Sequence, residues 1–316
     1  MILIKERIGK LVEDLKKLIY VGEVPIAGYR MLRSGERFSD IHDLPSDGWE
    51  ELTNRELWGG HREYFWFKTV VTIPAEFQDK CVVYELKTGR EGQWDATNPQ
   101  FTAYVNGVRR QGLDVNHREV MLTEKAVAGE SYQIVLSAFT GDENFKLVMD
   151  SAIKITDPET EQYYYDISVP YQVARLLPAD DSSYISIIQA VNESLNLVDL
   201  RKEYSREYYE SLKRAREYMK KEFYDKYCGN SSETAYCVGH THIDVAWLWT
   251  LAVTEDKAVR SFSTVLELMK RYPEYIFMSS QPQLYKYVKK NAPEIYEEIK
   301  QRVAEGRWEP EGGMFV

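Results

Sequence analysis

Residues 235–250 decide the fold; they read Ala-Tyr-Cys-Val-Gly-His-Thr-His-Ile-Asp-Val-Ala-Trp-Leu-Trp-Thr. The apolar run 235–239 has the composition of a short buried strand, and three potential metal ligands, His240, His242 and Asp244, follow it at alternate positions. Residues two apart in an extended chain point to the same side. We therefore expect the strand to end in a converging set of imidazole and carboxylate groups, with Trp247 just beyond them.

This pattern predicts a metal site. A histidine nitrogen and an aspartate oxygen together suit Zn²⁺ or a similar divalent ion. In parallel sheets and barrels the functional groups lie at the carboxyl ends of the strands, where this motif stands. The structural alternative is a capping or core-histidine cluster, but three candidate ligands within five residues favour a metal. The spacing does not choose between His240 and His242.

Downstream of the motif, strand and helix patterns alternate. We predict a helix over 254–270 with Thr254 as its cap, a strand over 275–279, a helix over 283–306 interrupted near Pro293, and a strand-like segment over 308–316. This order is typical of βαβ units with a parallel sheet. A (β/α) barrel takes about 250 residues. We therefore expect either a small sheet or, as we favour, the first part of a longer enzyme.

Upstream, short strand patterns recur at roughly ten-residue spacing between residues 64 and 155, which favours a β-sandwich or jelly roll. Asn106-Gly107 between two of them is a strong hairpin signal. Helical patterns flank this region; they cover 4–19, 161–177 with a break at Pro170, 181–200 and 203–227. Residues 228–232 form a linker. We predict two domains, 1–232 with the sandwich and its flanking helices, and 233–316.

Composition narrows the class of protein. The chain has 316 residues, 44% of them hydrophobic, and a formal net charge of -10, which fits a globular protein and argues against a nucleic-acid partner. No apolar run reaches the length of about 18–20 residues that spans a membrane. The N-terminal region is charged and lacks the apolar segment of a signal peptide. Three scattered cysteines indicate reduced thiols. We expect a cytoplasmic protein without a membrane partner; the oligomeric state, including a homo-oligomer, stays open.

The longer string 239–250 resembles the first-strand signature of the glycoside hydrolase family 38 α-mannosidases. Segments 277–285 and 306–316 resemble the second and third strand regions of that family, in the right order. Upstream, 104–107 and 116–120 resemble the β-domain that precedes the catalytic domain in the cytosolic branch. The resemblance extends from about Trp58 to the end of the chain.

The resemblance implies a retaining α-mannosidase that acts on oligosaccharides with terminal α-linked mannose. It implies a galactose-binding-like jelly roll followed by a (β/α)7 barrel, and one divalent metal, usually zinc. By match to the motif, His242 and Asp244 would be metal ligands and Trp247 would contact the sugar. His240 would then either support the ligands without binding the metal or have a structural role. The nucleophilic aspartate and the second histidine ligand of the family would lie beyond Val316. No catalytic residue is therefore assigned within the chain, and residues 1–316 alone are expected to be inactive.

Two other functions remain open. One is a carbohydrate-binding module that holds sugar through exposed rings such as Trp66 or Trp94, although packing in a core or interface is the simpler role for these rings. The other is a different metallohydrolase that uses His240 and His242 together. Amidohydrolase barrels carry such a His-x-His pair, whereas β-lactamase-like metallohydrolases would need a histidine where Val245 stands.

Overall fold

The computed structural model describes residues 2–53, 56–94, 96–228 and 234–311. Internal contacts divide the chain into two compact units, which we call the helical unit (Met1–Glu23 with Lys154–Ala235) and the mixed unit (Val24–Ile153 with Tyr236–Val316). The predicted division between residues 232 and 233 stays a prediction, because units of dense contact need not coincide with domains.

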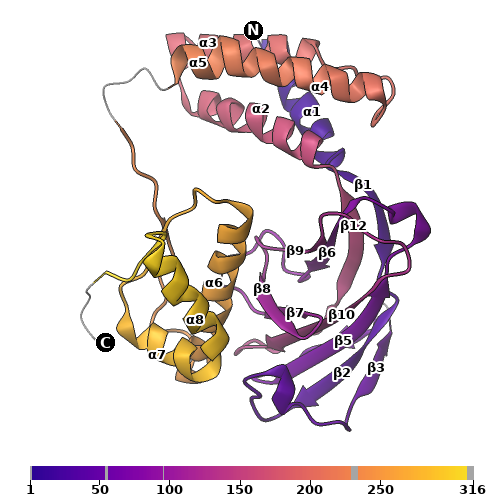
Figure 1. Ribbon diagram of the computed structural model, residues 1–316, viewed down its shortest axis with the longest axis vertical. Coiled ribbons are helices and arrows are strands. Elements are labelled where there is room, and N and C mark those ends of the chain that lie inside the picture. The colour runs from indigo at the N-terminus through magenta and orange to yellow at the C-terminus, as the bar shows by residue number, and fades with distance from the viewer. Residues whose placement is uncertain (1, 54–55, 95, 229–233, 312–316) are drawn as a thin grey trace. The chain divides into compact units, whose positions relative to one another are not determined.

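The helical unit is built around one apolar core. Its helices are α1 (Ile2–Lys17), α2 (Pro158–Leu176), α3 (Ser182–Asn196), α4 (Arg206–Met219), the π-helical turn Lys220–Tyr224 and α5 (Asp225–Tyr227) (Figure 1). Buried side chains from α1 to α4 pack together, among them Leu15, Ile167, Val191 and Leu212. The break expected at Pro170 is wrong: α2 runs through it, because the buried side chains on either side of the proline belong to the same core and hold the helix together.

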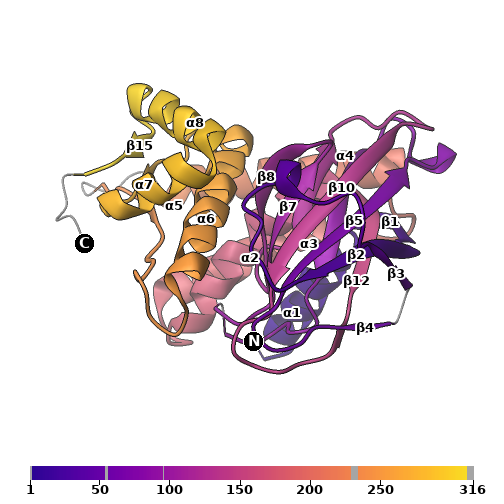
Figure 2. The ribbon, with the colours of Figure 1, turned by 90° about the horizontal axis from the view of Figure 1, so that it is seen from below.

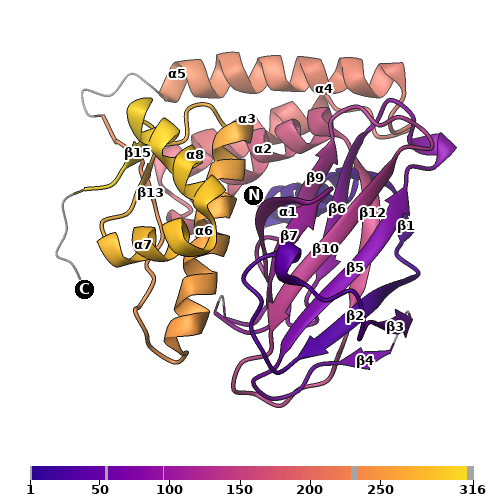
Figure 3. The ribbon, with the colours of Figure 1, turned by 60° about the horizontal axis from the view of Figure 1, so that its bottom comes forward.

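The mixed unit contains an antiparallel six-stranded sheet with strand order β3-β2-β5-β10-β7-β8 (Figure 3). The strands of this region are β2 (Gly28–Ser34), β3 (Glu50–Thr53), β4 (Leu57–Trp58), β5 (Tyr64–Thr72), β6 (Cys81–Lys87), β7 (Gln100–Val105), β8 (Val108–Leu113), β9 (Glu119–Thr123), β10 (Ser131–Phe139) and β11 (Leu147–Val148). β6 pairs with β9, and β11 with β4. The boundary between the units passes through β1 (Tyr20–Pro25) and β12 (Asp150–Thr156). Short 3-10 turns lie at Ile41–Asp43 and Ala75–Phe77. The predicted strands are present, but the sequence patterns did not reveal β1 to β4.

The rest of the mixed unit alternates strands and helices. Its elements are β13 (Gly239–His240), α6 (Leu251–Arg271), β14 (Phe277–Met278), α7 (Pro282–Asn291), α8 (Pro293–Ala304) and β15 (Trp308–Glu309). The three strands pair in parallel, which confirms the predicted parallel sheet. Phe262, Phe277, Leu284 and Trp308 form the centre of its core, with α6, α7 and α8 packed beside one another (Figure 2). The chain thus has a mixed α and β architecture with several sheets.

Two local predictions around the motif need correction. The buried strand expected over 235–239 is confined to Gly239–His240, and Tyr236 is 89% exposed because residues 235–238 pair with no strand. The helix α6 begins earlier than expected: Thr250 is its cap, and its hydroxyl accepts a hydrogen bond from the Val253 amide. Thr254 is instead buried inside the helix. The end of the predicted strand 308–316 lies outside the described residues.

The helix α6 also contacts strand β8 of the six-stranded sheet. The Gly112 amide donates to the Thr264 hydroxyl at 2.9 Å, and Arg110 forms an ion pair with Glu267 at 2.9 Å. A side chain at Gly112 would collide with Arg260, since an added Cβ would lie 2.4 Å from its Cγ. The sheet and the motif-bearing segment are therefore held at a fixed separation inside one unit.

Among the described helices, none is both long and apolar enough to cross a bilayer.

Candidate functional site

The three candidate ligands separate into a pair and a single residue. His242 Nε2 lies 3.1 Å from Asp244 Oδ1, so the structure brings these two side chains together. His240 Nδ1 instead lies 3.0 Å from the Met278 carbonyl oxygen, on the neighbouring strand β14. This follows from the parallel register, in which His240 is the partner of Met278. The ring of His240 is thus tied to the sheet backbone, while His242 and Asp244 face each other in the loop after β13.

The pair fits a zinc ion in its donor types. Two tetrahedral ligands that each lie about 2.0–2.2 Å from one zinc ion are separated by about 3.3–3.6 Å, and the observed 3.1 Å is slightly shorter, so the two side chains would move apart by a few tenths of an ångström around an ion. The side chains of His242 and Asp244 are 73% and 39% exposed, so both are accessible to an ion. Within the described part of the chain, no group of three or more His, Cys, Asp or Glu side chains converges as a metal site. The described residues therefore supply two of the roughly four ligands that zinc prefers.

Three tryptophans line the same hollow as this pair. Trp247 is 54% exposed, and its ring centroid lies 5.6 Å from that of Trp249 and 5.5 Å from that of Trp94. Trp249 is held in place by two contacts: its indole N–H donates to the Thr254 hydroxyl at 3.1 Å, and the Lys257 ammonium lies 4.4 Å from its ring centroid. The predicted sugar-contacting ring is therefore part of an ordered aromatic cluster.

The two rings considered for a carbohydrate-binding module have different environments. Trp66 is 2% exposed and packs with Leu32, Tyr104 and Val135 in a small core. Its face is therefore closed to a sugar. Trp94, in contrast, is 57% exposed and stands at the motif.

A hollow of about 490 Å³ lies between the motif and the sheet. Its polar lining comes from the β-sheet region and from the motif-bearing segment and includes Gln100, Asp114, His117, His240, His242, Asp244, Lys257 and Arg260. Lys257 Nζ and Arg260 Nη2 donate to the same oxygen, Gln100 Oε1, at 2.8 and 2.5 Å. Burial, and then the positive charge of Arg260, lower the pKa of Lys257 to about 7. Gln100, Asp114 and Lys257 were not predicted as site residues, because they are distant in sequence and no spacing pattern connects them.

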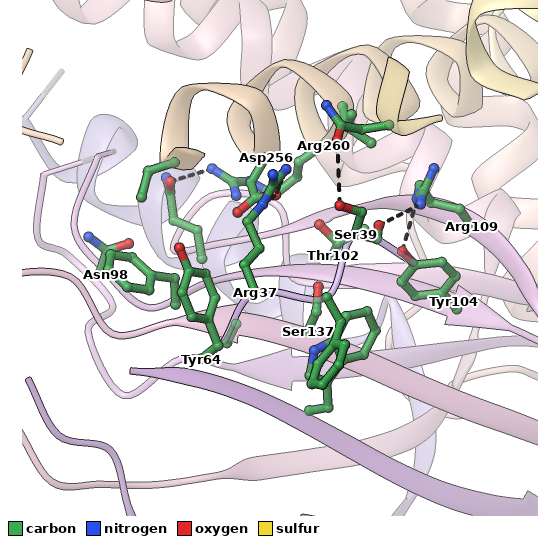
Figure 4. Close-up of a pocket in the computed structure, with 18 residues that line it drawn as sticks. Arg37, Ser39, Tyr64, Asn98, Thr102, Tyr104, Arg109, Ser137, Asp256 and Arg260 are labelled. Carbon is green, nitrogen blue, oxygen red and sulfur yellow. Dashed lines mark hydrogen bonds and ion pairs between the residues drawn. The ribbon is translucent and has the colours of Figure 1, made fainter. Parts of the chain in front are cut away.

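A second, much smaller cavity of about 40 Å³ lies deeper between the sheet and α6 (Figure 4). Arg37, from the loop after β2, forms ion pairs there with Glu255 at 2.8 Å and Asp256 at 2.7 Å. Arg109, 6% exposed, donates to the Tyr104 hydroxyl at 3.0 Å and pairs with Asp40 at 2.7 Å. These contacts involve most of the charged side chains that line the cavity, and they join the sheet to α6. The cavity therefore offers little room for a ligand.

Comparison with known proteins identifies relatives that match most of the chain. Residues 232–316 match the model of the glycosyl hydrolases family 38 N-terminal domain. The chain is 28% identical over 283 residues to Alpha-mannosidase G of Dictyostelium discoideum, covering 83% of this chain and 24% of the relative. It is 29% identical over 279 residues to an Alpha-mannosidase of Saccharomyces cerevisiae, covering 79% and 24%. Human Alpha-mannosidase 2C1 is 42% identical over 94 residues, covering 30% and 9%.

Among solved structures, a β-glucuronidase from Ruminococcus gnavus aligns with 43% of this chain and 30% of its own, at 13% identity and a TM-score of 0.31. This likeness is too slight to bear on the fold or the function. The chain spans about a quarter of the length of the α-mannosidases that it matches over most of its residues. These matches agree with the family that the motif suggested: residues 232–316 are similar to the N-terminal domain of glycosyl hydrolases family 38.

Proposed function

We propose that this chain is part of a metal-dependent retaining α-mannosidase that removes terminal α-linked mannose from oligosaccharides. The observation that carries the proposal is the His242–Asp244 pair at the carboxyl end of β13, 3.1 Å apart and beside the exposed ring of Trp247. Metal sites of parallel α/β folds occupy this position. The curated relatives support the choice of reaction, since they are α-mannosidases.

The fold that accompanies this function is a jelly-roll sandwich followed by the first strands of a (β/α)7 barrel. The six-stranded antiparallel sheet supports the first part and the parallel strands β13 to β15 support the second. In this arrangement residues 25–153 form the wall of the site that faces the barrel. The nucleophilic aspartate and the remaining metal ligands lie outside residues 1–316, and this part alone is inactive.

His242 Nε2 and one oxygen of Asp244 would hold the ion, and one nitrogen donor with one hard oxygen donor suits zinc. Once bound, zinc supplies positive charge that attracts and orients sugar hydroxyls. Trp247 presents its indole face to the apolar C–H face of the mannose ring and excludes water from that side. His240, bonded to the Met278 carbonyl, fixes the strand from which the two ligands project. The enzyme acts in the cytoplasm, on a sugar rather than on a nucleic acid or a membrane.

The decisive experiment is a metal analysis and an α-mannosidase assay on the intact gene product that contains this chain. We expect hydrolysis of an aryl α-mannoside, its loss after treatment with a chelator, and its recovery when zinc is restored. Retention of the anomeric configuration in the first-formed product would establish the retaining course. Absence of hydrolysis in protein that carries a full complement of metal would refute the proposal.

A further inference from the structure

The loop between strands β6 and β7, of which residues 88–94 and 96–99 are described, reaches the proposed sugar-contacting ring of the motif. Its Trp94 meets Trp247 edge to face, with ring centroids 5.5 Å apart and ring planes at 89°. Contacts within the loop hold it: the amide and hydroxyl of Thr88 donate to Glu91 Oε1 at 2.6 and 3.2 Å, and the Thr97 amide donates to the Trp94 carbonyl at 2.9 Å. The position of Trp94 is therefore set by the loop itself.

Trp94 and Trp247 differ from the other tryptophans of the chain. They are 57% and 54% exposed, whereas Trp58, Trp66 and Trp308 are 2% exposed or less. An indole is a large apolar surface, and its exposure to water is unfavourable unless a ligand or partner covers it. Both rings line the same hollow as the metal-ligand pair, so a ligand bound at that pair could cover both.

The angle between the rings limits what they can bind. A pyranose ring stacks with one flat C–H face on one aromatic face, so a single sugar cannot lie flat on two planes that meet at 89°. Two linked sugar units can, because rotation about the glycosidic bond turns their faces relative to each other. Polar groups that can bind hydroxyls stand close by: Asp114 and His117 line the same hollow, and two amides fix Asp114 Oδ1, those of Asn116 and His117, both at 2.8 Å.

We propose that Trp94 is a specificity-determining residue that contacts the sugar unit next to the mannose bound at Trp247, so that the β-sheet region of the mixed unit selects oligosaccharides over simple mannosides. This inference rests on the proposed function, because it takes the mannose position from that proposal. It assigns to loop 88–99 a role in substrate recognition in addition to packing.

Equilibrium binding tests this role without requiring turnover. The probes are methyl α-mannoside and an α-mannobiose whose bridging oxygen is replaced by sulfur, which resists hydrolysis; binding to the intact gene product is followed by calorimetry. We expect Trp94→Ala to weaken binding of the thio-disaccharide about tenfold, the loss of one stacked aromatic contact, and to change the methyl mannoside affinity less than about twofold. Trp94→Phe should retain most of the affinity. Trp247→Ala should weaken both ligands.

The matched control is Tyr165→Ala, which removes an aromatic ring of similar exposure, 53%, far along the chain in the helical unit; it should alter neither affinity. An equal loss for both ligands in Trp94→Ala would mean that Trp94 acts only by supporting Trp247, and no loss for either would mean that it has no role. Both results overturn the inference while the proposed function stands. Failure of the unaltered protein to bind or hydrolyse any mannoside would instead count against the proposed function, and the inference would fall with it.

Discussion

Arg37 and Asp256 join the six-stranded sheet to helix α6: the guanidinium donates from Nε and Nη2 to Asp256 Oδ1, at 2.9 and 2.7 Å. The same guanidinium bonds Glu255 through Nη1 at 2.8 Å. Burial alone would raise the pKa of Glu255, but the hydrogen bonds from Arg37, Lys290 and Asn291 bring it below its ordinary value. One arginine thus pairs with two carboxylates in the second turn of the helix after the motif, which ties the geometry of the motif to the sheet.

Replacing Arg37 by Met should destabilise the mixed unit by about 2–3 kcal/mol, because two partly buried carboxylates lose a shared partner. All seven tryptophans lie in the mixed unit, so urea unfolding followed by tryptophan fluorescence reports on that unit. Arg30→Met is the control: Arg30 forms an exposed pair with Glu51 at 3.6 Å, and its loss should cost less than about 1 kcal/mol. Equal effects of the two substitutions would show that the contact between sheet and helix does not depend on Arg37.

Trp308 anchors the parallel sheet, and its removal should have a larger effect. The ring is 1% exposed and lies 4.7 and 5.1 Å from the rings of Phe277 and Phe262; its N–H donates to the Tyr285 hydroxyl at 2.8 Å. Trp308→Ala should cost about 3–5 kcal/mol of unfolding free energy through the cavity it leaves. Trp308→Phe, which loses mainly the hydrogen bond, should cost less. Leu248→Ala, at a 65% exposed side chain, is the control and should leave the urea midpoint unchanged. A midpoint shift for Trp308→Ala as small as that control would contradict this account of the core.

Periodicity predicted those parts of the fold in which one residue face is buried. The alternation of strand and helix patterns after residue 239 predicted the parallel sheet, because each helix carries a stripe of apolar residues that only a sheet or another helix can cover. Strand β2 was missed since its buried positions, Tyr29 and Leu32, are three apart and do not alternate. The helix break predicted at Pro170 was wrong because a proline lowers helix propensity only locally. The core formed by α1 to α4 stabilises the whole of helix α2.

The candidate site was predictable only where its residues are close in sequence. The spacing of His242 and Asp244 put both on one side of the chain, and the structure places them 3.1 Å apart. The separation of His240 from this pair required knowledge of the register with β14, which no local pattern contains. Trp94 and Lys257 reach the same hollow through folding of distant segments. Their roles therefore emerge only from tertiary structure.

The different surroundings of His240 and His242 give a direct prediction for metal binding, which depends on the proposed function. His242→Ala removes a ligand and should weaken zinc binding by more than about 100-fold, whereas His240→Ala removes only a supporting contact and should cost about tenfold or less. Asp244→Asn should resemble His242→Ala. The measurement is zinc retained by the intact gene product at a series of buffered free-zinc concentrations. Equal losses for the two histidines would favour a metallohydrolase that uses both as ligands.

Lys257 should make the stability of the mixed unit depend on pH. Its pKa in the folded protein is about 7, against 10.5 for an ordinary lysine, so between these values the unfolded chain binds more protons than the folded one. The free energy of unfolding should therefore rise with pH across this window, by at most about 1.4 kcal/mol per pH unit. Below pH 7 Lys257 is protonated in both the folded and the unfolded state, so the folded protein bears the full cost of burying the charge.

Lys257→Met should remove this rise, so the variant should be most favoured relative to the unaltered protein at pH 6.5 and should have lost about half of that advantage by pH 9, partway through the window between the two pKa values. Urea unfolding monitored by tryptophan fluorescence at both pH values measures the difference. Lys300→Met is the control, because the hydrogen bond and charge of Glu297 hold the pKa of Lys300 above its usual value, and that side chain stays protonated over the whole range. If the unfolding free energies of the Lys257 variant and the unaltered protein changed in parallel with pH, the ammonium would not be buried as the contact with Gln100 requires.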